Sequence, residues 1–294
     1  MLIGAKLQNS GPLPMTRGIP ELAATLERGG ADSIWVSDHV VMPREINSRY
    51  PFATDGRATW PTDTPYIEAL VALALAAAAT ARVRLGTAVL VLPLRNPVMF
   101  AKQTASIDAA SGGRLELGLG AGWLAEEFAA LNAPFDRRGV QLREWIAIAR
   151  QCWTGFPAEC SSRDYVLPAD TVCQPTPAHR IPILLGGHSD RALARVGAIA
   201  DGWLGQQSAP ELDSRPITDA RSRFLDAANQ AGRDGTSIRT VLRIIDSAGR
   251  AELVAESLPS LAQAGVDEVI VDLSWEGDDQ AEQLAVLRAG AAAA

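Results

Sequence analysis

Lysine is almost absent from this chain: Lys6 and Lys102 are the only two, against 25 arginines. Because Schiff-base catalysis needs a buried lysine beside the chemistry, this scarcity disfavours an aldolase-type enzyme. The three cysteines, Cys152, Cys160 and Cys173, show no metal-ligand spacing, and their odd number suits a reducing compartment. We therefore expect a cytoplasmic protein without a metal site.

Long apolar runs and an excess of positive charge are also missing. The most apolar stretch covers residues 67–79 and contains Glu68, which is too short for the roughly 20 residues of a membrane span. The first residues, MLIGAKLQNS, lack the basic and apolar segments of a secretion signal. The net charge of −7 argues against the basic face that nucleic-acid binding requires. We expect neither a membrane nor a nucleic-acid partner.

Short apolar runs of strand type alternate with longer stretches of helical period over the whole chain. The predicted strands are 2–7, 33–37, 83–89, 114–119, 181–185, 202–204, 238–245 and 267–272. The predicted helices are 17–28, 65–80, 97–110, 139–153, 191–200, 211–230, 251–264 and 280–289. Eight strand–helix units favour a closed (β/α)8 TIM-type barrel over a doubly wound sheet, as a single domain over 1–294.

Two segments interrupt the alternation, 41–63 after the second strand and 153–180 before the fifth. Long loops in a compact domain are usually functional or disordered. The first segment leaves the catalytic end of a barrel strand and carries Tyr50, Phe52 and Trp60. We interpret it as a lid, with packing against a neighbouring subunit as the alternative.

The chemistry of a barrel lies where its strands end. Asp38 and His39 follow the second predicted strand. Histidine can gain or lose a proton near neutral pH, so His39 is a candidate general acid or base. The alternative is a structural histidine bonded to a loop carbonyl. Neither residue has a second histidine or cysteine at ligand spacing, which argues against a metal site.

The fifth predicted strand runs through Gly186 and Gly187 into a helix that begins near His188 and Ser189. Free backbone N–H groups at a helix start bind phosphate. A pair of glycines also serves as a plain left-handed turn, so this signal alone is moderate.

Small residues follow the fourth predicted strand as well. The run GLGAG at 118–122 lacks the full spacing of a dinucleotide fingerprint. Ala121 and Gly122 instead leave room for a flat ring against the backbone. Trp123 and Trp203 border the same mouth, either as pocket wall or as core.

Three stretches together carry a family resemblance: DSIWVSDHVVMP (32–43), RVRLGTAVLVLPLRNPVMFAKQTASIDAASGGRLELGLGAGWLAEEF (82–128) and PILLGGHSDRALARVGAIADGW (182–203). In order and spacing they resemble the luciferase-like monooxygenase superfamily, in particular its coenzyme F420-dependent oxidoreductases of actinobacteria. The agreement covers residues 1–205, and beyond them only the strand–helix alternation supports it.

The resemblance implies roles on the ring side of a cofactor site. His39 matches an active-site histidine beside the reactive carbon of the deazaflavin. Asp38 matches a residue that contacts the ring or the hydroxyls of the cofactor. Ala88 and Val89 match a non-prolyl cis peptide against the back of the ring.

The resemblance also implies a lining and a phosphate site. Ala121 and Gly122 match a loop that lines the cofactor. Gly186 and Gly187 match the turn that holds its phosphate, with His188 at the start of the following helix.

Two departures from the family pattern bear on the substrate. Sugar-phosphate dehydrogenases of the superfamily carry a glutamate where this chain has Trp123, and a lysine near positions 206–209, where this chain has none. A phosphorylated sugar is therefore disfavoured as a substrate, and His39 is left as the evident proton donor.

The resemblance favours an F420-dependent oxidoreductase that acts on a small organic molecule and forms a homodimer. A two-component monooxygenase that uses reduced FMN and a non-catalytic flavin-binding barrel are the alternatives. F420 ends in an anionic oligoglutamate tail and calls for an open, arginine-lined exit groove, whereas FMN ends at its phosphate.

Overall fold

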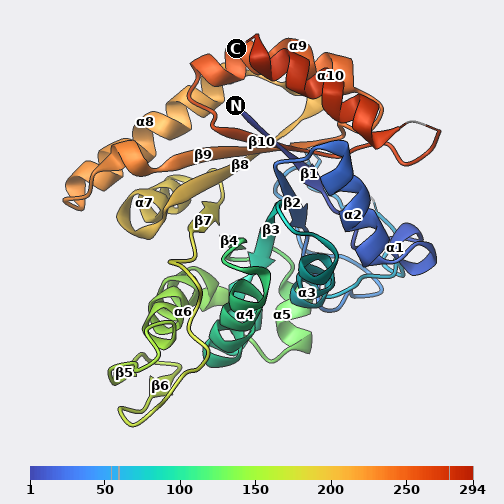
Figure 1. Ribbon diagram of the computed structural model, residues 1–294. Coiled ribbons are helices and arrows are strands. Elements are labelled where there is room, and N and C mark those ends of the chain that lie inside the picture. Colours follow the sequence, from blue (N-terminus) through green and yellow to red (C-terminus); the bar gives the residue numbers. More distant parts are fainter. Residues whose placement is uncertain (54, 59, 278, 294) are drawn as a thin grey trace.

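Eight parallel strands close into a barrel in the computed structural model, which describes residues 1–53, 55–58, 60–277 and 279–293 (Figure 1). Around the barrel the order is β1-β10-β9-β8-β7-β4-β3-β2. The strands are β1 (Leu2–Lys6), β2 (Ser33–Val36), β3 (Arg84–Val91), β4 (Leu115–Gly120), β7 (Ile183–Gly186), β8 (Gly202–Ser208), β9 (Arg239–Ile245) and β10 (Glu268–Val271). The predicted (β/α)8 barrel is confirmed.

The strand expected at 202–204 is longer than predicted. β8 continues to Ser208 because it pairs with β9 along its whole length, from Gly202 opposite Arg239 to Ser208 opposite Ile245. Its second half contains Gln206 and Gln207, which hide the strand from a search for apolar runs. The extension brings polar side chains to the mouth of the barrel.

Helices surround the barrel (Figure 1). They are α1 (Leu13–Thr16), α2 (Ile19–Gly29), α3 (Ala69–Ala79), α4 (Pro97–Ser111), α5 (Ala125–Ala130), α6 (Arg138–Cys152), α7 (Asp190–Ile199), α8 (Ser214–Gln230), α9 (Ala251–Gln263) and α10 (Gln280–Ala292). Each of the eight predicted helices is present. The two short ones, α1 and α5, were not predicted, because four and six residues are too few to show a helical period.

Both long segments of the sequence prediction lie outside the barrel wall. Between β2 and α3, the described residues form turns and loops without a helix or strand of their own, and positions 54 and 59 of this segment lie outside the described residues. The segment after α6 carries a small antiparallel hairpin, β5 (Cys160–Ser161) and β6 (Val166–Leu167). In Figure 1 this hairpin lies beyond α6, away from the barrel.

The inside of the barrel is filled by its own small cluster of buried side chains. They are Trp35, Leu184, Leu204, Val241 and Ile270. A larger apolar layer joins the outer face of the strands to the helices. The barrel is therefore a packed core with no channel through it, as is usual for this architecture.

An ion-pair network closes the end of the barrel where the strands begin. Arg84 and Arg239 each contact both Glu116 and Glu268. Ser33 donates a hydrogen bond to Glu268, which is fully buried. Every charge in this network has partners of the opposite sign. No described helix is long and apolar enough to cross a membrane.

Candidate active site

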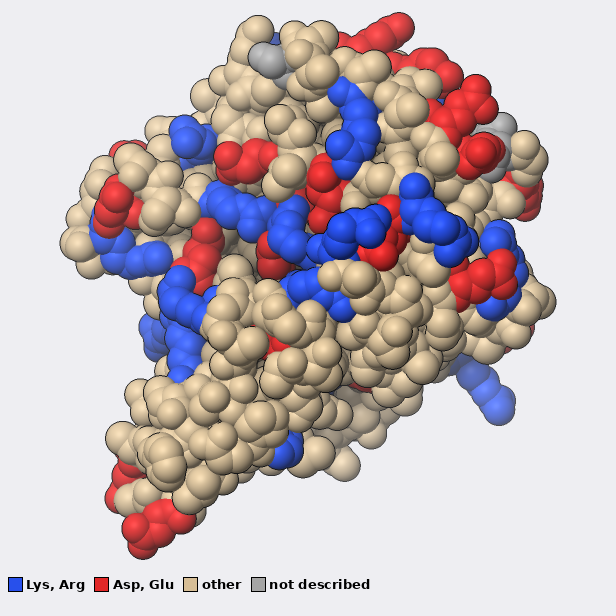
Figure 2. Space-filling view, in the orientation of Figure 1, with Lys and Arg blue, Asp and Glu red and all other residues tan. Residues whose placement is uncertain are grey.

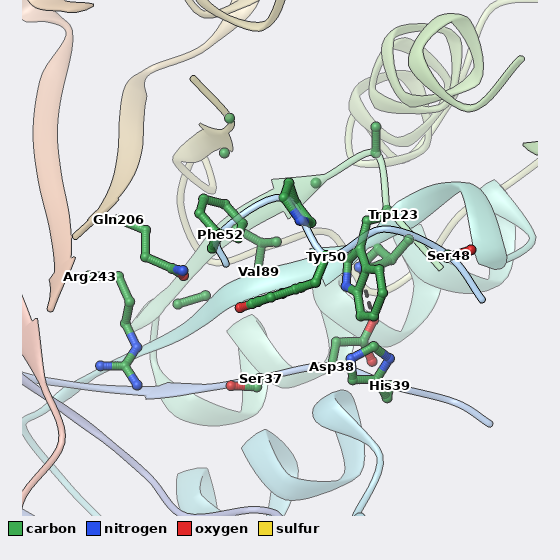
Figure 3. Close-up of a pocket in the computed structure, with 18 of the residues that line it drawn as sticks. Ser37, Asp38, His39, Ser48, Tyr50, Phe52, Val89, Trp123, Gln206 and Arg243 are labelled. Atoms are coloured by element: carbon green, nitrogen blue, oxygen red, sulfur yellow. Dashed lines mark hydrogen bonds between the residues drawn. The ribbon is translucent and has the colours of Figure 1, made fainter. Parts of the chain in front are cut away.

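A pocket of about 1300 Å³ opens at the other end of the barrel, where the strands finish (Figure 3). All nine residues singled out from the sequence line it. They are Asp38, His39, Ala88, Val89, Ala121, Gly122, Gly186, Gly187 and His188. Segments that are far apart in the chain thus meet around one cavity, as strand ends of a barrel must. Their binding of a cofactor stays a prediction.

His39 is held by a buried glutamate of α5. Its Nδ1 lies 3.1 Å from Oε2 of Glu127. The other carboxylate oxygen, Oε1, accepts hydrogen bonds from the backbone N–H groups of Val40, at 2.6 Å, and Val41, at 3.2 Å. An ionised carboxylate only accepts, so Nδ1 of His39 carries a hydrogen. The opposite ring nitrogen, Nε2, is therefore the one left for chemistry.

Aromatic rings surround the His39 imidazole on its pocket side. Ring centroids lie 5.8 Å from Tyr66, 6.2 Å from Trp123 and 6.4 Å from Trp60. Burial raises the pKa of the Tyr66 hydroxyl, which interacts with the Ser37 side chain, so Tyr66 stays neutral. Within the described residues, Nε2 of His39 makes no hydrogen bond to the protein. It is a free donor or acceptor in an apolar surrounding.

Asp38 does not present its carboxylate to the pocket. Arg95 binds both carboxylate oxygens, each at 2.7 Å, and the N–H of Val91 donates to one of them at 2.9 Å. Burial raises the pKa of the Asp38 carboxyl, and the Arg95 guanidinium opposes that rise. The side chain ties the end of β2 to the end of β3. Only the backbone of Asp38 remains for the ligand contact that the resemblance implies.

The peptide bond between Ala88 and Val89 is cis, as the resemblance predicts. It lies where the register of β3 against β4 shifts, between Thr87 and Leu90. A Cβ added to Gly120 on β4 would meet Val89 at 2.7 Å. Glycine at that position therefore lets the two strands approach and leaves Val89 free to form a flat patch of the pocket wall.

The predicted phosphate turn has the geometry of a helix start. Gly187 adopts a φ of +122°, a conformation that favours glycine. Ser189 caps α7 by accepting from the N–H of Ala192. Trp203 is buried in the core and donates to the carbonyl of Gly187 at 2.9 Å, which fixes the turn. Of the two tryptophans left open above, Trp123 is thus pocket wall and Trp203 is core.

His188 sits beside this turn as a neutral side chain. Burial lowers its pKa, and its Nε2 accepts a hydrogen bond from the backbone N–H of Gln206 at 3.2 Å. The positive charge near the turn comes instead from Arg138 and Arg195, which line the pocket there. Arg138 is anchored by donating to the carbonyl of Gly122 at 3.1 Å.

The segment between β2 and α3 covers the pocket as the lid interpretation expects. Figure 3 shows Tyr50 crossing the cavity, with its hydroxyl toward Gln206 and Arg243 and its backbone near Trp123. Its ring lies 5.1 Å from that of Trp123. The ring of Phe52 lies 5.7 Å from that of His188.

A second glutamate of α5 latches this lid. Oε1 of Glu126 accepts from the N–H groups of Asn47, at 2.7 Å, and Ser48, at 3.0 Å, while the Ser48 hydroxyl donates to Oε2 at 2.6 Å. Partial burial opposes ionisation, but the Ser48 hydroxyl and the backbone N–H groups prevail and lower the pKa of Glu126. Neighbouring glutamates of one short helix therefore hold His39 and the lid.

A model of the luciferase-like monooxygenase family matches residues 3–294. The chain belongs to this family. An uncharacterized protein of Mycobacterium tuberculosis (strain ATCC 25618 / H37Rv) is 39% identical over 193 residues, which span 65% of this chain and 66% of that protein. The F420-dependent glucose-6-phosphate dehydrogenase of Amycolatopsis mediterranei is 29% identical over 204 residues, which span 68% of this chain and 55% of that enzyme.

Among solved structures, an F420-dependent secondary alcohol dehydrogenase in complex with an F420-acetone adduct superposes with a TM-score of 0.77. The match covers 98% of this chain and 99% of that one at 17% identity, and it shows the shared fold of this luciferase-like barrel.

Several residues of the site were not found from the sequence. Glu127 lies on the short helix α5 beyond the end of β4, a position that an analysis of strand ends does not include. Arg138, Arg195 and Arg243 line the pocket from helices and from β9. These long arginine side chains reach the mouth of the barrel from positions that do not directly follow a strand.

A buried strand-end lysine was also missed. Lys6 is the last residue of β1, and its amine donates to the Leu7 carbonyl and, at 2.9 Å, to Asn9. Burial, reinforced by the charge of Arg243, lowers its pKa to about 7. Lys6 is buried and is not among the residues that line the pocket, so it gives a Schiff-base mechanism no support.

Proposed function

We propose that this luciferase-like protein is a coenzyme F420-dependent oxidoreductase that transfers a hydride from the reduced deazaflavin to a small uncharged carbonyl compound, or from the corresponding alcohol to the oxidised deazaflavin. The observation that carries the proposal is the pairing of His39 with Glu127 at one end of a pocket whose other end is a glycine turn flanked by arginines. The His39–Glu127 pair can donate or accept a proton, and the glycine turn can bind a phosphate.

The residues present fit a flat, phosphorylated cofactor. Gly120 leaves Val89 exposed as a patch on which a ring can lie. The Gly186–Gly187 turn offers backbone N–H groups at the start of α7, with Arg138 and Arg195 beside it. A volume of about 1300 Å³ exceeds the roughly 300–1000 Å³ of most ligand sites and leaves space for a substrate beside the cofactor.

A bound deazaflavin would supply the hydride when reduced and accept it when oxidised, and His39 handles the proton. In carbonyl reduction, the protonated imidazole donates the hydrogen on Nε2 to the substrate oxygen as the carbon accepts the hydride. In alcohol oxidation, neutral His39 accepts that proton at Nε2. In both directions Glu127 accepts from Nδ1–H and stabilises the positive charge on the imidazole.

The wall around His39 limits the substrate. Tyr50, Trp60, Tyr66 and Trp123 form contiguous aromatic contacts there, with Tyr50 and Trp60 ring centroids 5.0 Å apart. Such a wall excludes water and stabilises apolar groups. The glutamate and lysine that serve a sugar phosphate in the family are absent, which supports an uncharged substrate.

The test is an anaerobic screen of the purified protein. We expect some simple secondary alcohols to reduce F420, or some ketones or enones to oxidise reduced F420, as followed by the absorbance and fluorescence of the deazaflavin. A protein that changes neither over a broad panel, yet consumes O₂ with reduced FMN, would contradict the proposal and support a monooxygenase.

A further inference from the structure

All three cysteines of the chain lie at the end of α6 or in the segment that follows it. This segment, residues 153–173, carries the β5–β6 hairpin and forms a side lobe that stands out at the lower left of Figure 2. The surface of the side lobe is mainly uncharged there, with acidic side chains at its tip. Cys152 is buried, while Cys160 and Cys173 are half-buried and pack against the same apolar core. The three thiols therefore share one apolar surrounding.

The backbone brings Cys173 back to the end of α6. The N–H of Gly155 donates to the carbonyl of Cys152 at 3.1 Å, and the N–H of Cys173 donates to the carbonyl of Gly155 at 2.9 Å. Gly155 adopts a φ of +86°, and a Cβ there would lie 2.8 Å from the Gln174 side chain, so glycine permits this close approach. The chain thus leaves α6 and returns to the same point about 20 residues later.

The side chains of Cys152 and Cys173 are in contact at this junction. Burial, the contact with the Cys173 thiol and the nearby Cys160 raise the pKa of the Cys152 thiol to about 12. A buried thiol with a raised pKa stays protonated and is a poor nucleophile on its own. Cys173 is half-buried, so an oxidant from solvent reaches its sulfur before that of Cys152.

The backbone on both sides of this pair of cysteines is held in place. Cys152 belongs to the last turn of α6, and the Lys102 amine of α4 donates to the carbonyl of Gln174, directly after Cys173. A disulfide requires neighbouring backbones and side chains that point toward each other. Both conditions are met at this junction, so a bond between the two sulfurs requires no rearrangement of the barrel.

We infer that Cys152 and Cys173 form a reversible oxidation site that reacts with a hydroperoxide and fastens the side lobe to α6. The Cys173 sulfur takes one oxygen from the peroxide and becomes a sulfenic acid, while the peroxide is reduced to an alcohol or, for hydrogen peroxide, to water. The Cys152 sulfur then attacks the Cys173 sulfur, a disulfide forms, and the hydroxyl group leaves with the thiol proton as water. A thiol reductant returns the pair to the two free thiols of this structure. The inference is independent of the proposed function.

The experiment treats the purified protein with a small excess of hydrogen peroxide, blocks the remaining thiols by alkylation and digests the protein without reductant. Peptide mass spectrometry should find Cys152 joined to Cys173 and Cys160 alkylated. The oxidised protein should melt about 5 °C higher than the reduced one, because a bond that closes a loop of about 20 residues restricts the unfolded chain. A thiol reductant should abolish the difference.

Cys152→Ala and Cys173→Ser should each lose both the linked peptide and the rise in melting temperature on oxidation. Cys160→Ser is the matched control, because it removes a thiol from the same side lobe, and it should keep both. Each variant is compared with its own reduced form, so a change in the stability of the reduced protein does not affect the result.

Three free thiols after peroxide treatment, or a sulfinic acid at Cys173 without a linked peptide, would overturn the oxidation site. A wild-type product that joins Cys160 to either of the other cysteines would overturn its assignment to Cys152 and Cys173. A linked peptide without a rise in melting temperature would overturn the conclusion that the bond fastens the side lobe. None of these outcomes bears on the binding of a deazaflavin.

Discussion

The two ends of the barrel use charge in opposite ways. Where the strands begin, Arg84, Arg239, Glu116 and Glu268 satisfy one another completely. Where the strands finish, within the described residues, His39 has a hydrogen-bond partner on one ring nitrogen only, and Arg138 and Arg195 have no carboxylate partner. The two ends belong to the same strands and are separated by only a few residues along each strand.

This difference separates structural charge from functional charge. A buried ion network with every partner present holds the fold in one register, and it has no capacity left to bind a ligand. An oriented imidazole and unpaired arginines contribute little to folding and remain available to a proton and an anion, as the proposed function requires. Charged side chains are present at both ends of the barrel. What distinguishes the two ends is whether each charged side chain has a partner of opposite sign.

The largest effect on turnover should follow removal of the His39 imidazole, where the strands finish. His39→Ala should lower turnover by about 10²–10⁴, or roughly 3–5 kcal/mol of transition-state stabilisation, because His39 carries the proton in the proposed reaction. Cofactor affinity should stay nearly unchanged, because the phosphate turn and the Val89 patch are intact. Steady-state kinetics and a fluorescence titration measure the two quantities. A histidine of structural importance would give the reverse pattern, with a lower melting temperature and normal turnover.

At the end where the strands begin, Glu268→Ala should lower the free energy of unfolding instead of turnover. It removes one of the two carboxylate partners of Arg84 and of Arg239 while Glu116 stays, so the loss should be smaller than the about 3–5 kcal/mol of a buried pair that is broken outright. Thermal and urea unfolding measure the loss, with Glu252→Ala, an exposed change on α9, as control. Cofactor binding at low temperature should be unaffected. Loss of binding without loss of stability would undo the contrast between the ends.

Glu127→Gln tests how His39 is positioned at the end of the barrel where the strands finish. The amide oxygen must take the place of Oε1 to accept from Val40 and Val41, so the amide nitrogen faces Nδ1 of His39. Nδ1 must then accept, and the hydrogen of the neutral ring moves to Nε2. Turnover in alcohol oxidation should fall by about 10²-fold, because Nε2 can no longer take the proton.

Nitrogen NMR of the histidine rings tests this without cofactor or substrate, and three histidines make assignment simple. The wild-type protein should carry the hydrogen of neutral His39 on Nδ1, and Glu127→Gln on Nε2. Glu126→Gln is the control, since that side chain contacts the lid and leaves His39 alone. An unchanged tautomer in Glu127→Gln would show that this glutamate does not position His39.

The smallest effect is expected for the hydrogen bonds between Glu126 and the lid. Glu126→Gln weakens the hydrogen bonds to Ser48 and Asn47 and loosens the lid, so KM should rise a few-fold while kcat changes little. Ser48→Ala should act in the same direction, because its hydroxyl donates to the same carboxylate. A fall in kcat as large as that of Glu127→Gln would mean that the two glutamates do not act separately.

The barrel and the ring of strand ends could be predicted because period and chain order determine them. Eight alternations fixed the topology, and His39, Gly186 and Gly187 reached the pocket because strand ends of a barrel must converge. The cis bond at Ala88–Val89 came from the resemblance alone, since no residue pattern in one sequence signals it.

Side-chain direction was what the sequence could not provide. Asp38 follows a strand as His39 does, yet its carboxylate turns away to Arg95, a partner 57 positions along the chain. Glu127 and Arg195 approach from helices, and their arrival depends on how those helices pack. Lys6 lies within the predicted strand 2–7, and only the packing of the structure shows that its amine is buried.

The most direct test of the account is an equilibrium titration of the wild-type protein with F420 and with FMN, each followed by fluorescence. We predict saturable binding of F420, weaker binding of FMN, and F420 affinity that is kept in His39→Ala and lowered in Arg195→Gln. Binding of neither cofactor, or tighter binding of FMN with no dependence on Arg195, would contradict the assignment of the open end to a deazaflavin.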